Sequence, residues 1–282
     1  MPSLAEKRDR LLASLQRLDS CAVAFSGGVD SAVVAKAAEL ALGNRALAVT
    51  AVSASLAAGE LEQAIELAAH IGIRHEIIET EEMANPAYVA NGPDRCYHCK
   101  DELYSRLQPL LSEWGVEMLV NGANCDDLGD YRPGLRAASE KAVLSPLAEC
   151  GLTKADVRDL AEAWKLPVWN KPALPCLSSR LAYGLEVTPE RLAMVDRAEQ
   201  FLREAGYKTV RVRCHEGELA RLEVAGEEVA GLVEPEFRAR LVSYLSELGF
   251  RYVTVDLEGF RSGSQNLVLS VESLQSVSRP TR

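Results

Sequence analysis

The sequence lacks the features of a membrane or exported protein. No apolar run approaches the ~20 residues that a membrane-spanning helix needs. Residues 1–19 form a charged amphipathic pattern instead of the apolar centre of a signal peptide. We therefore expect a cytoplasmic protein with no membrane partner.

Basic residues are also in short supply. Lys and Arg number 31 against 41 Asp and Glu, which gives a formal net charge of −10. This balance argues against nucleic acid as the main partner, although it leaves room for a local basic patch. With 282 residues, of which 48% are hydrophobic, the chain can bury a large core in one or two domains. Its 7 cysteines, in an expected intracellular chain, indicate thiol or metal chemistry instead of a disulfide framework.

Two common phosphate-binding signatures are missing. The chain has no Gly-Lys-Ser/Thr ending of a Walker A motif here, and Ser31 stands where the dinucleotide-binding fingerprint has its third glycine. A different turn lies between the apolar run 21–25 and the helix-like segment 32–42. Glycines without a Cβ let its backbone N–H groups approach a polyphosphate at a helix N-terminus, and its two serines add hydroxyl donors. The sequence of this turn is Ser26-Gly27-Gly28-Val29-Asp30-Ser31.

Asp30 indicates which ligand this turn binds. A carboxylate beside an anion site is costly unless a cation lies between them, and Mg²⁺ is the obvious candidate. An ordinary strand-to-helix turn with a serine N-cap is the alternative. Because the strand, glycines, carboxylate and helix follow in the order that the mechanism needs, we predict a magnesium–nucleotide site.

Strand-like and helix-like segments alternate through the first half of the chain. Such alternation predicts an α/β fold with a doubly wound parallel sheet, whose ligands bind beyond the carboxyl ends of the strands. The expected strands are 21–25, 46–52, 75–78 and 118–120, and the expected helices are 32–42, 60–71, 100–114 and 154–164.

A cluster of prolines at 167, 172 and 175 predicts the end of the first domain. We expect a nucleotide-binding domain at 1–172, a linker at 173–184 that carries Cys176, and a smaller α+β domain at 185–282 for substrate binding and oligomerisation. The second domain is expected to contain helices 189–204 and 235–248 and strands 209–213, 219–224 and 251–255.

Cys96 and Cys99 have C-x-x-C spacing, and Cys176 supplies a third thiol. Three thiolates fit a 4Fe-4S cluster whose fourth iron stays open for an exchangeable sulfide. The alternatives are zinc completed by His98 or Cys125, thiols that carry sulfur as a persulfide, and inert packing. Three further cysteines in apolar or isolated settings are expected in the core, namely Cys21, Cys150 and Cys214.

Other polar groups suggest anion and metal contacts. Asp126 and Asp127 follow a strand and are expected on the same sheet rim as Asp30, as magnesium or ribose ligands or as an ordinary Asx turn. Arginines suit bidentate phosphate recognition, although arginines on a strand are commonly only a solvated face. The groups expected to meet phosphate are Lys100, Arg180, Arg211 and Arg213, with the turns 130–134, which carries Arg132, and 260–264.

The glycine turn resembles the PP-loop of ATP pyrophosphatases, which have an adenine nucleotide alpha hydrolase-like fold. Over nearly the whole chain the motifs resemble the LarE family of sulfur transferases; they are SGGVDS, RCYHCK, NGANCDDLGDYRPG, PCLSSRLAYG, TVRVRCHE and RYVTVDLEGFRSG. The resemblance implies that ATP adenylates the carboxylates of pyridinium-3,5-dicarboxylate mononucleotide. Sulfur then replaces oxygen to give the thiocarboxylates of the nickel-pincer nucleotide cofactor. It also implies homo-oligomers, often hexamers, and a three-cysteine form with a 4Fe-4S cluster.

The resemblance implies a role for each matching residue. Ser26, Gly27, Gly28, Asp30 and Ser31 would hold pyrophosphate and Mg²⁺, and Lys100, Arg180, Arg211 and Arg213 would serve the substrate phosphate or the adenylate. Cys96, Cys99 and Cys176 would hold the cluster, and Glu199 and Glu223 would form part of an acidic metal site. The sequence does not disclose the sulfur donor. A tRNA thiolase of the PP-loop superfamily and a non-catalytic nucleotide-binding redox sensor are the rival functions.

Overall fold

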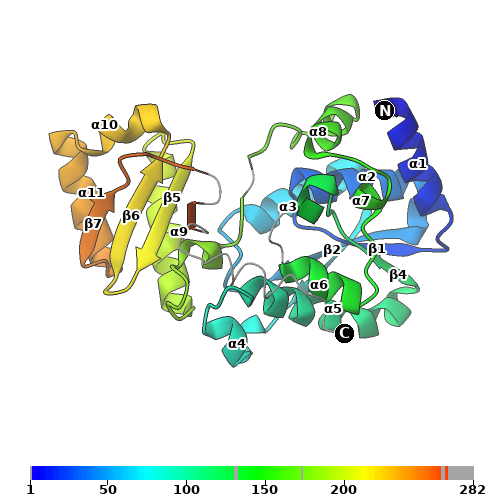
Figure 1. The fold of residues 1–282 in the computed structure, drawn as a ribbon, viewed down its shortest axis with the longest axis horizontal. Coiled ribbons are helices and arrows are strands. Elements are labelled where there is room, and N and C mark those ends of the chain that lie inside the picture. Colours follow the sequence, from blue (N-terminus) through cyan, green and yellow to red (C-terminus); the bar gives the residue numbers. More distant parts are fainter. Residues whose placement is uncertain (1, 130–132, 173, 262–263, 266–282) are drawn as a thin grey trace.

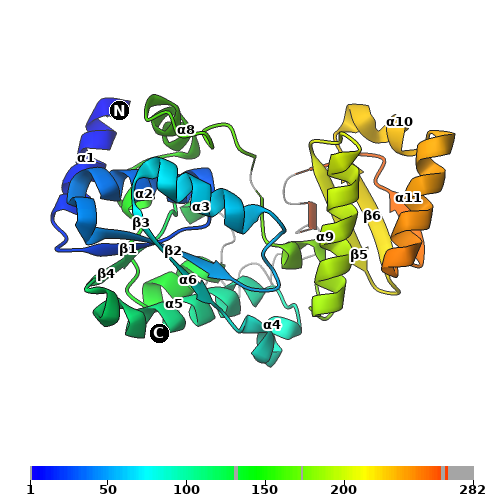
Figure 2. The same ribbon diagram turned by 180° about the vertical axis from the view of Figure 1, so that it is seen from behind.

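The computed structural model describes residues 2–129, 133–172, 174–261 and 264–265 (Figure 1). These residues contain two separate β-sheets, one with four strands and one with three. Figures 1 and 2 show the larger sheet with its helices at one end of the molecule and the smaller sheet at the other.

The larger sheet is wholly parallel, with the strand order β3-β2-β1-β4. Cys21 at the start of β1 lies opposite Ala46 of β2 and Met118 of β4. The predicted doubly wound α/β fold is therefore confirmed. The strands are β1 (Cys21–Ala24), β2 (Ala46–Val52), β3 (Arg74–Glu79) and β4 (Met118–Val120).

Helices cover both faces of this sheet. Along β1, Cys21 and Val23 contribute to one apolar core while Ala22 contributes to another, as the two-residue period of a strand requires. The first core is completed by α1 (Leu4–Gln16), α2 (Val29–Leu42), α3 (Glu60–Ile71) and α8 (Lys154–Ala163). The second is completed by α5 (Arg95–Trp114) and α6 (Pro133–Glu140), on the opposite face in Figure 1.

The smaller sheet has the order β5-β6-β7, with β5 and β6 antiparallel and β6 and β7 parallel. It has a core of its own, formed with α9 (Pro189–Glu204) and α11 (Pro235–Leu248). The second sheet agrees with the predicted α+β unit, whereas the boundaries at 172 and 185 stay a prediction. Its strands are β5 (Val210–His215), β6 (Leu219–Val224) and β7 (Tyr252–Val255).

The helix that carries the C-x-x-C pair begins earlier than predicted. It starts at Arg95 instead of Lys100, so Cys96 and Cys99 lie in its first turns. The turn predicted at 130–134 is wrong at its end, because Pro133 and Gly134 open helix α6. Its other residues, including Arg132, lie outside the described part of the chain.

The described residues also contain three short α-helices: α4 (Pro86–Val89), α7 (Pro146–Glu149) and α10 (Val229–Leu232). No helix within the described residues has the length and apolarity to cross a membrane. Ser262 and Gly263 of the predicted turn 260–264 lie outside the described residues, as does the tail 271–282.

Candidate active site

The glycine turn joins the end of β1 to the start of α2. Gly27 has a φ of +70°, and a Cβ there would lie 3.4 Å from the Cβ of Ala64 on α3, so glycine suits both the conformation and the space. Ser31 Oγ donates to the carbonyl of Gly28 (3.0 Å) and accepts from the N–H of Ser26 (3.2 Å). The second serine thus braces the turn whose N–H groups are expected to meet phosphate.

Asp30, in the first turn of α2, is contacted by two residues from distant parts of the chain. Its Oδ1 accepts from Asn124 Nδ2 (3.0 Å), and its Oδ2 forms an ion pair with Lys154 at the start of α8. The backbone approaches equally closely, because a Cβ at Gly122 would lie 2.8 Å from the nitrogen of Ser31. The segments after β1 and β4 therefore meet at the rim of the sheet.

The carboxylates of Asp126 and Asp127 bind backbone N–H groups of Lys154 and Asn124, the two residues whose side chains contact Asp30. Asp127 is buried and accepts from the N–H of Asn124 (3.0 Å), while Asp126 Oδ2 accepts from the N–H of Lys154 (2.8 Å). The Asx turn in this motif belongs to Asn124, whose Oδ1 accepts from the N–H of Asp126 (2.9 Å). A role of Asp126 and Asp127 as magnesium or ribose ligands stays a prediction.

Sequence reasoning missed Asn124 and Lys154. Both make side-chain contacts with Asp30, yet neither belongs to the glycine turn. Asn124 belongs to the same motif as Asp126 and Asp127, so its position near Asp30 could have been predicted from the sequence. Nothing local marked Lys154, because its approach depends on the way α8 packs on α2.

Cys96, Cys99 and Cys176 are free thiols, the first and last exposed and Cys99 half-buried. Burial raises the pKa of Cys99 to about 12, with Lys100 acting against this rise and the negative charges of Cys176 and Cys96 adding to it. Burial alone would lower the pKa of Lys100, but Tyr104 and the three thiols raise it overall. The thiols and Lys100 thus share one electrostatic environment.

A ready-made metal site is absent from the part of the chain that the structure describes, where no three His, Cys, Asp or Glu side chains are arranged to hold an ion. His98 Nε2 pairs with Asp94 Oδ2 (3.2 Å), and Cys125 Sγ contacts the carbonyl of Ala148 (3.5 Å). The donor types suit an iron–sulfur cluster, but the side chains do not themselves form its ligand set. Cluster and zinc both stay predictions.

The remaining cysteines lie where expected. Cys21, Cys150 and Cys214 are buried. Desolvation raises the pKa of Cys21 to about 12 and that of Cys214 to about 11. A thiol with a raised pKa is a poor nucleophile at neutral pH, which agrees with a packing role.

The segment that carries Cys176 lies at the carboxyl end of β2. The N–H of Leu177 donates to the carbonyl of Ser55 (2.9 Å) in the loop after that strand. Glu82, which is buried, accepts from the hydroxyls of Ser53 (2.5 Å) and Ser55 (3.1 Å) and fixes this loop. Cys176 therefore lies at the edge of the sheet where the glycine turn also lies.

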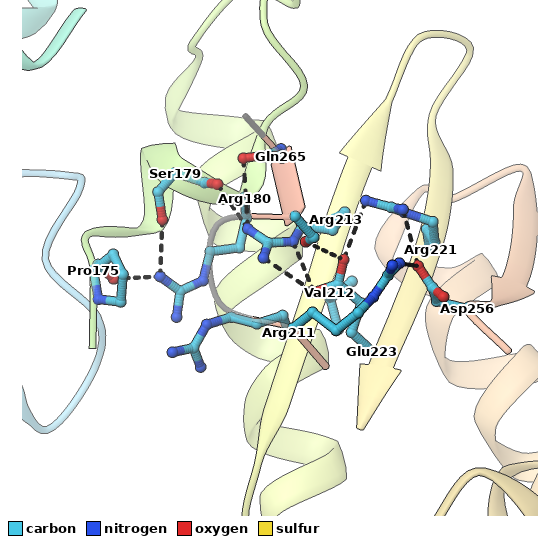
Figure 3. A network of polar contacts seen from close by, with 12 residues as sticks. Pro175, Ser179, Arg180, Arg211, Val212, Arg213, Arg221, Glu223, Asp256 and Gln265 are labelled. Carbon is cyan, nitrogen blue, oxygen red and sulfur yellow. Dashed lines mark hydrogen bonds and ion pairs between the residues drawn. The ribbon is translucent and has the colours of Figure 1, made fainter. Parts of the chain in front are cut away.

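Buried arginines and carboxylates join the Cys176 segment to the smaller sheet (Figure 3). Arg180 forms a two-pronged ion pair with Glu199, through contacts of 2.8 and 3.1 Å between side chains that are 1% and 0% exposed. Arg213 contacts Glu223 with both Nε (3.1 Å) and Nη2 (3.0 Å). Arg203 also binds Glu199, and Arg221 also binds Glu223.

Both carboxylates predicted to hold a metal are therefore engaged by arginine. Glu199 Oε1 additionally accepts from the N–H of Val212 (3.1 Å), and Glu223 Oε1 accepts from the hydroxyl of Ser264 (3.3 Å). Arginine neighbours lower the pKa of Glu199 below its usual value, although burial acts in the opposite direction. The acidic metal site stays a prediction.

Arg211 is buried in the same cluster, and its guanidinium lies 5.1 Å from the ring centroid of Phe260. Burial, together with the positive charge of Arg180, lowers the pKa of Arg211 to about 10, against the opposing effect of Glu199. Burial and the neighbouring arginines disfavour the charged form of this guanidinium, so a nearby anion would stabilise it. The cluster therefore has the electrostatics of an anion site.

Comparison with known proteins agrees with this geometry. Residues 12–106 match the NAD synthase family. An uncharacterized protein of Synechocystis is 49% identical over 267 residues, which cover 95% of this chain and 99% of that protein. Pyridinium-3,5-bisthiocarboxylic acid mononucleotide synthase of Lactiplantibacillus plantarum is 39% identical over 275 residues, or 97% of this chain and 99% of that enzyme. The chain belongs to the family of this synthase.

The family is the LarE family that the motifs resembled, so that resemblance is confirmed, as is the expectation of a PP-loop enzyme. A more distant relative is a glutamine-hydrolysing GMP synthase chain of Archaeoglobus fulgidus, 28% identical over 195 residues, or 64% of this chain and 63% of that relative. Membership in the LarE family does not assign the individual site residues, whose roles stay predictions.

Proposed function

We propose that this LarE-family protein is an ATP-dependent sulfur transferase that acts on pyridinium-3,5-dicarboxylate mononucleotide. It adenylates the carboxylates and replaces oxygen by sulfur, giving the thiocarboxylates of the nickel-pincer nucleotide cofactor. The observation that carries this proposal is the similarity to the Lactiplantibacillus synthase over 97% of the chain. The glycine turn, the free thiols and the arginine cluster give each step a chemical basis.

Adenylation comes first, because a carboxylate is a poor electrophile whereas AMP leaves readily from an acyl adenylate. ATP would lie with its phosphates against the N–H groups of Gly27 and Gly28, and the hydroxyl of Ser26 would add a donor. Asp30 would hold Mg²⁺, and Lys100 would offset negative charge that develops on pyrophosphate. The positive φ of Gly27 and the bracing by Ser31 support this placement.

The second step delivers sulfur to the activated carbonyl carbon. A nucleophilic sulfur held at the thiol site attacks this carbon, and AMP leaves with the bonding electrons. That sulfur would be a sulfide on a cluster or, in protein without a cluster, a persulfide on Cys176. A 4Fe-4S cluster on Cys96, Cys99 and Cys176 would supply an open iron for exchangeable sulfide, and the free state of all three thiols is compatible with this ligand set.

The arginine cluster is the proposed site for the phosphate of the mononucleotide. Arg211 and Arg213 lie on one face of β5, and Arg180 reaches the same region from the segment after Cys176 (Figure 3). Their combined charge favours a dianion. In this proposal Glu199 and Glu223 hold the arginines in place through their ion pairs.

The direct test incubates the protein with Mg–ATP alone, with the mononucleotide added, and with tRNA in its place. We expect AMP and pyrophosphate to form only with the mononucleotide, whose mass then shifts by the exchange of oxygen for sulfur. Stimulation by tRNA would indicate a tRNA thiolase, and no substrate-dependent pyrophosphate would indicate a redox sensor. Asp30→Asn should abolish AMP release, whereas Asp9→Asn on the exposed face of α1 should not.

A homo-oligomer is the assembly we propose, with the hexamer of LarE-family members as the expected state. Light scattering on the purified protein measures its mass directly. The sulfur donor can be identified with the same purified protein, by testing sulfide and free cysteine separately as sources in the transfer assay.

A further inference from the structure

A buried hydrogen-bonding hub binds the segment that follows Cys176. Asn91, at the junction of α4 and α5, is 0% exposed and has a φ of +53°. Its Nδ2 donates to the carbonyls of Ala182 (2.8 Å) and Leu185 (2.8 Å), and its own carbonyl accepts from the N–H of Gly184 (3.0 Å). The side chain and backbone of one residue thus secure the segment 181–185.

Arg95 extends this hub toward the cysteines. Its side chain is buried, and its Nη1 donates to Asn91 Oδ1 (2.7 Å) and to the carbonyl of Ser178 (2.7 Å). Its Nη2 lies 3.7 Å from Cys96 Sγ. A single guanidinium therefore joins the first turn of α5 to the residues just after Cys176.

The charge of Arg95 fits this position. An arginine guanidinium stays charged throughout the physiological pH range. Arg95 therefore remains cationic between the two parts of the chain that carry the thiols.

Tyr88 gives the same segment a second, independent anchor. Tyr88 and Ser178 are both almost completely buried, and the Tyr88 hydroxyl lies 2.6 Å from Ser178 Oγ. Leu177 is bound through its N–H to Ser55. Leu177 and Ser178, the two residues that follow Cys176, are thus hydrogen-bonded to Ser55 and Tyr88, respectively.

We propose that Arg95 is a positioning residue for sulfur transfer, which holds Cys176 opposite Cys96 and Cys99 by binding Ser178 and Asn91. The inference rests on the proposed function and refines it. None of the hydrogen bonds of Arg95 described above involves the glycine turn or Asp30. Loss of Arg95 should therefore impair the second step and spare adenylation.

The test compares the substitutions Arg95→Met, Arg95→Lys and Tyr88→Phe with the wild-type protein. AMP release and thiocarboxylate formation are measured in the same reaction. Arg106→Met is the matched control, because Arg106 lies on the same helix and forms exposed ion pairs with Glu81 and Glu102.

We expect Arg95→Met to lower the yield of thiocarboxylate per AMP about tenfold or more, as losses of supporting contacts do at other reactive sites. Arg95→Lys should recover part of this yield, since lysine keeps the charge and one donor toward Ser178. Tyr88→Phe removes one hydroxyl at almost constant shape, so it keeps the test informative if Arg95→Met does not fold. It should lower the same ratio by a smaller factor.

Hydrogen exchange gives a readout that does not depend on activity. In Arg95→Lys and Tyr88→Phe the amides of Leu177 and Gly184 should exchange faster than in the wild type, while those of α2 stay protected. Unchanged exchange together with an unchanged sulfur-to-AMP ratio would overturn the inference, as would a parallel loss of AMP release and sulfur transfer. If the wild type releases no substrate-dependent AMP, the proposed function fails, and the exchange data still decide whether Arg95 fixes this segment.

Discussion

Lys154 and Asp30 lie 124 residues apart in the sequence and form an ion pair at the rim of the larger sheet. Asn124 binds the other oxygen of the same carboxylate. The ammonium group of Lys154 therefore lies against the carboxylate that we predict to bind Mg²⁺. With side chains that are 35% and 26% exposed, the pair is accessible to solvent and can open when a metal–nucleotide complex arrives.

From this pair we predict that Lys154→Met strengthens Mg²⁺ binding at Asp30. Without the Lys154 ammonium, the negative charge of the Asp30 carboxylate is no longer partly neutralised, so it attracts Mg²⁺ more strongly. Exposed ion pairs contribute about 1 kcal/mol or less, so the Mg²⁺ concentration for half-maximal binding of a non-hydrolysable ATP analogue should fall by up to about fivefold. Calorimetric titration of the analogue at a series of Mg²⁺ concentrations measures the change.

Lys36→Met provides the control for that experiment. Lys36 pairs with Glu39 on the same helix α2, with comparable side-chain exposures of 22% and 27%. The control should leave the Mg²⁺ requirement unchanged. If the Mg²⁺ concentration for half-maximal binding is unchanged in Lys154→Met as well, Lys154 does not compete with Mg²⁺ for Asp30.

Of the two residues in the ion pair between Asp30 and Lys154, only Asp30 could be predicted from the local sequence. The strand, the glycines and Asp30 are contiguous, and each follows from backbone geometry or charge that can be read within a few residues. Lys154 depends on how α8 packs against α2, and no periodicity or motif spacing contains that information. The early start of α5 was missed for a related reason, since Arg95 to Cys99 show no apolar repeat and are fixed by contacts with other segments.

A second prediction concerns the close approach of Gly122 to α2. Gly122→Ala should destabilise the protein by about 1 to 3 kcal/mol, because its Cβ would lie 2.8 Å from the nitrogen of Ser31 and the backbone there must shift. The shift moves the turn that we expect to bind phosphate, so affinity for the ATP analogue should fall as well. Urea unfolding and calorimetry measure the two effects.

Gly129→Ala is the matched control, since a Cβ at Gly129 would have no atom of the described residues within 4 Å. It should change neither the stability nor the nucleotide affinity appreciably. Equal effects in both glycine variants would contradict a specific role for the close contact between Gly122 and Ser31.

A third prediction follows from the ion pair of Arg180 and Glu199. Glu199→Gln should cost about 3 to 5 kcal/mol of unfolding free energy, because it leaves Arg180 buried without its counter-charge. Arg203 cannot replace the lost negative charge, because it is itself a cation that pairs with the same carboxylate. Urea unfolding at neutral pH measures the loss, and Glu204→Gln near the end of the same helix is the control.

The same pair predicts a pH dependence with a definite sign. The folded-state pKa of Glu199 lies below its ordinary value of 4.5. A lowered folded-state pKa means that the stabilisation is fully present above pH 4.5 and is lost as the pH falls toward the folded value. The wild type should therefore lose stability faster than Glu199→Gln on acidification below pH 4.5. Parallel stability curves for the two proteins would contradict this prediction.

The arginine cluster marks another limit of sequence reasoning. Arg180, Arg211 and Arg213 could be selected as phosphate ligands from their residue type and from strand alternation. Their burial could not be foreseen, because it depends on Glu199 and Glu223 arriving from α9 and β6. A pattern of residues can identify which side chains carry charge, whereas the partner that neutralises each one is decided by tertiary packing.

The last prediction concerns the three candidate sulfur residues. Anaerobically purified protein should contain iron and acid-labile sulfide, and Cys96→Ala should lose both along with the visible absorbance, because a cluster with two protein ligands is poorly held. AMP release should survive this substitution, since Asp30 and the glycine turn remain intact. Cys150→Ala is the control and should keep its iron, because this thiol is buried in the core that α1, α2, α3 and α8 form with the larger sheet. Colourless wild-type protein that still transfers sulfur would contradict the cluster, and loss of the Cys176 sulfur after one turnover, detected by mass spectrometry, would identify that thiol as the sulfur source.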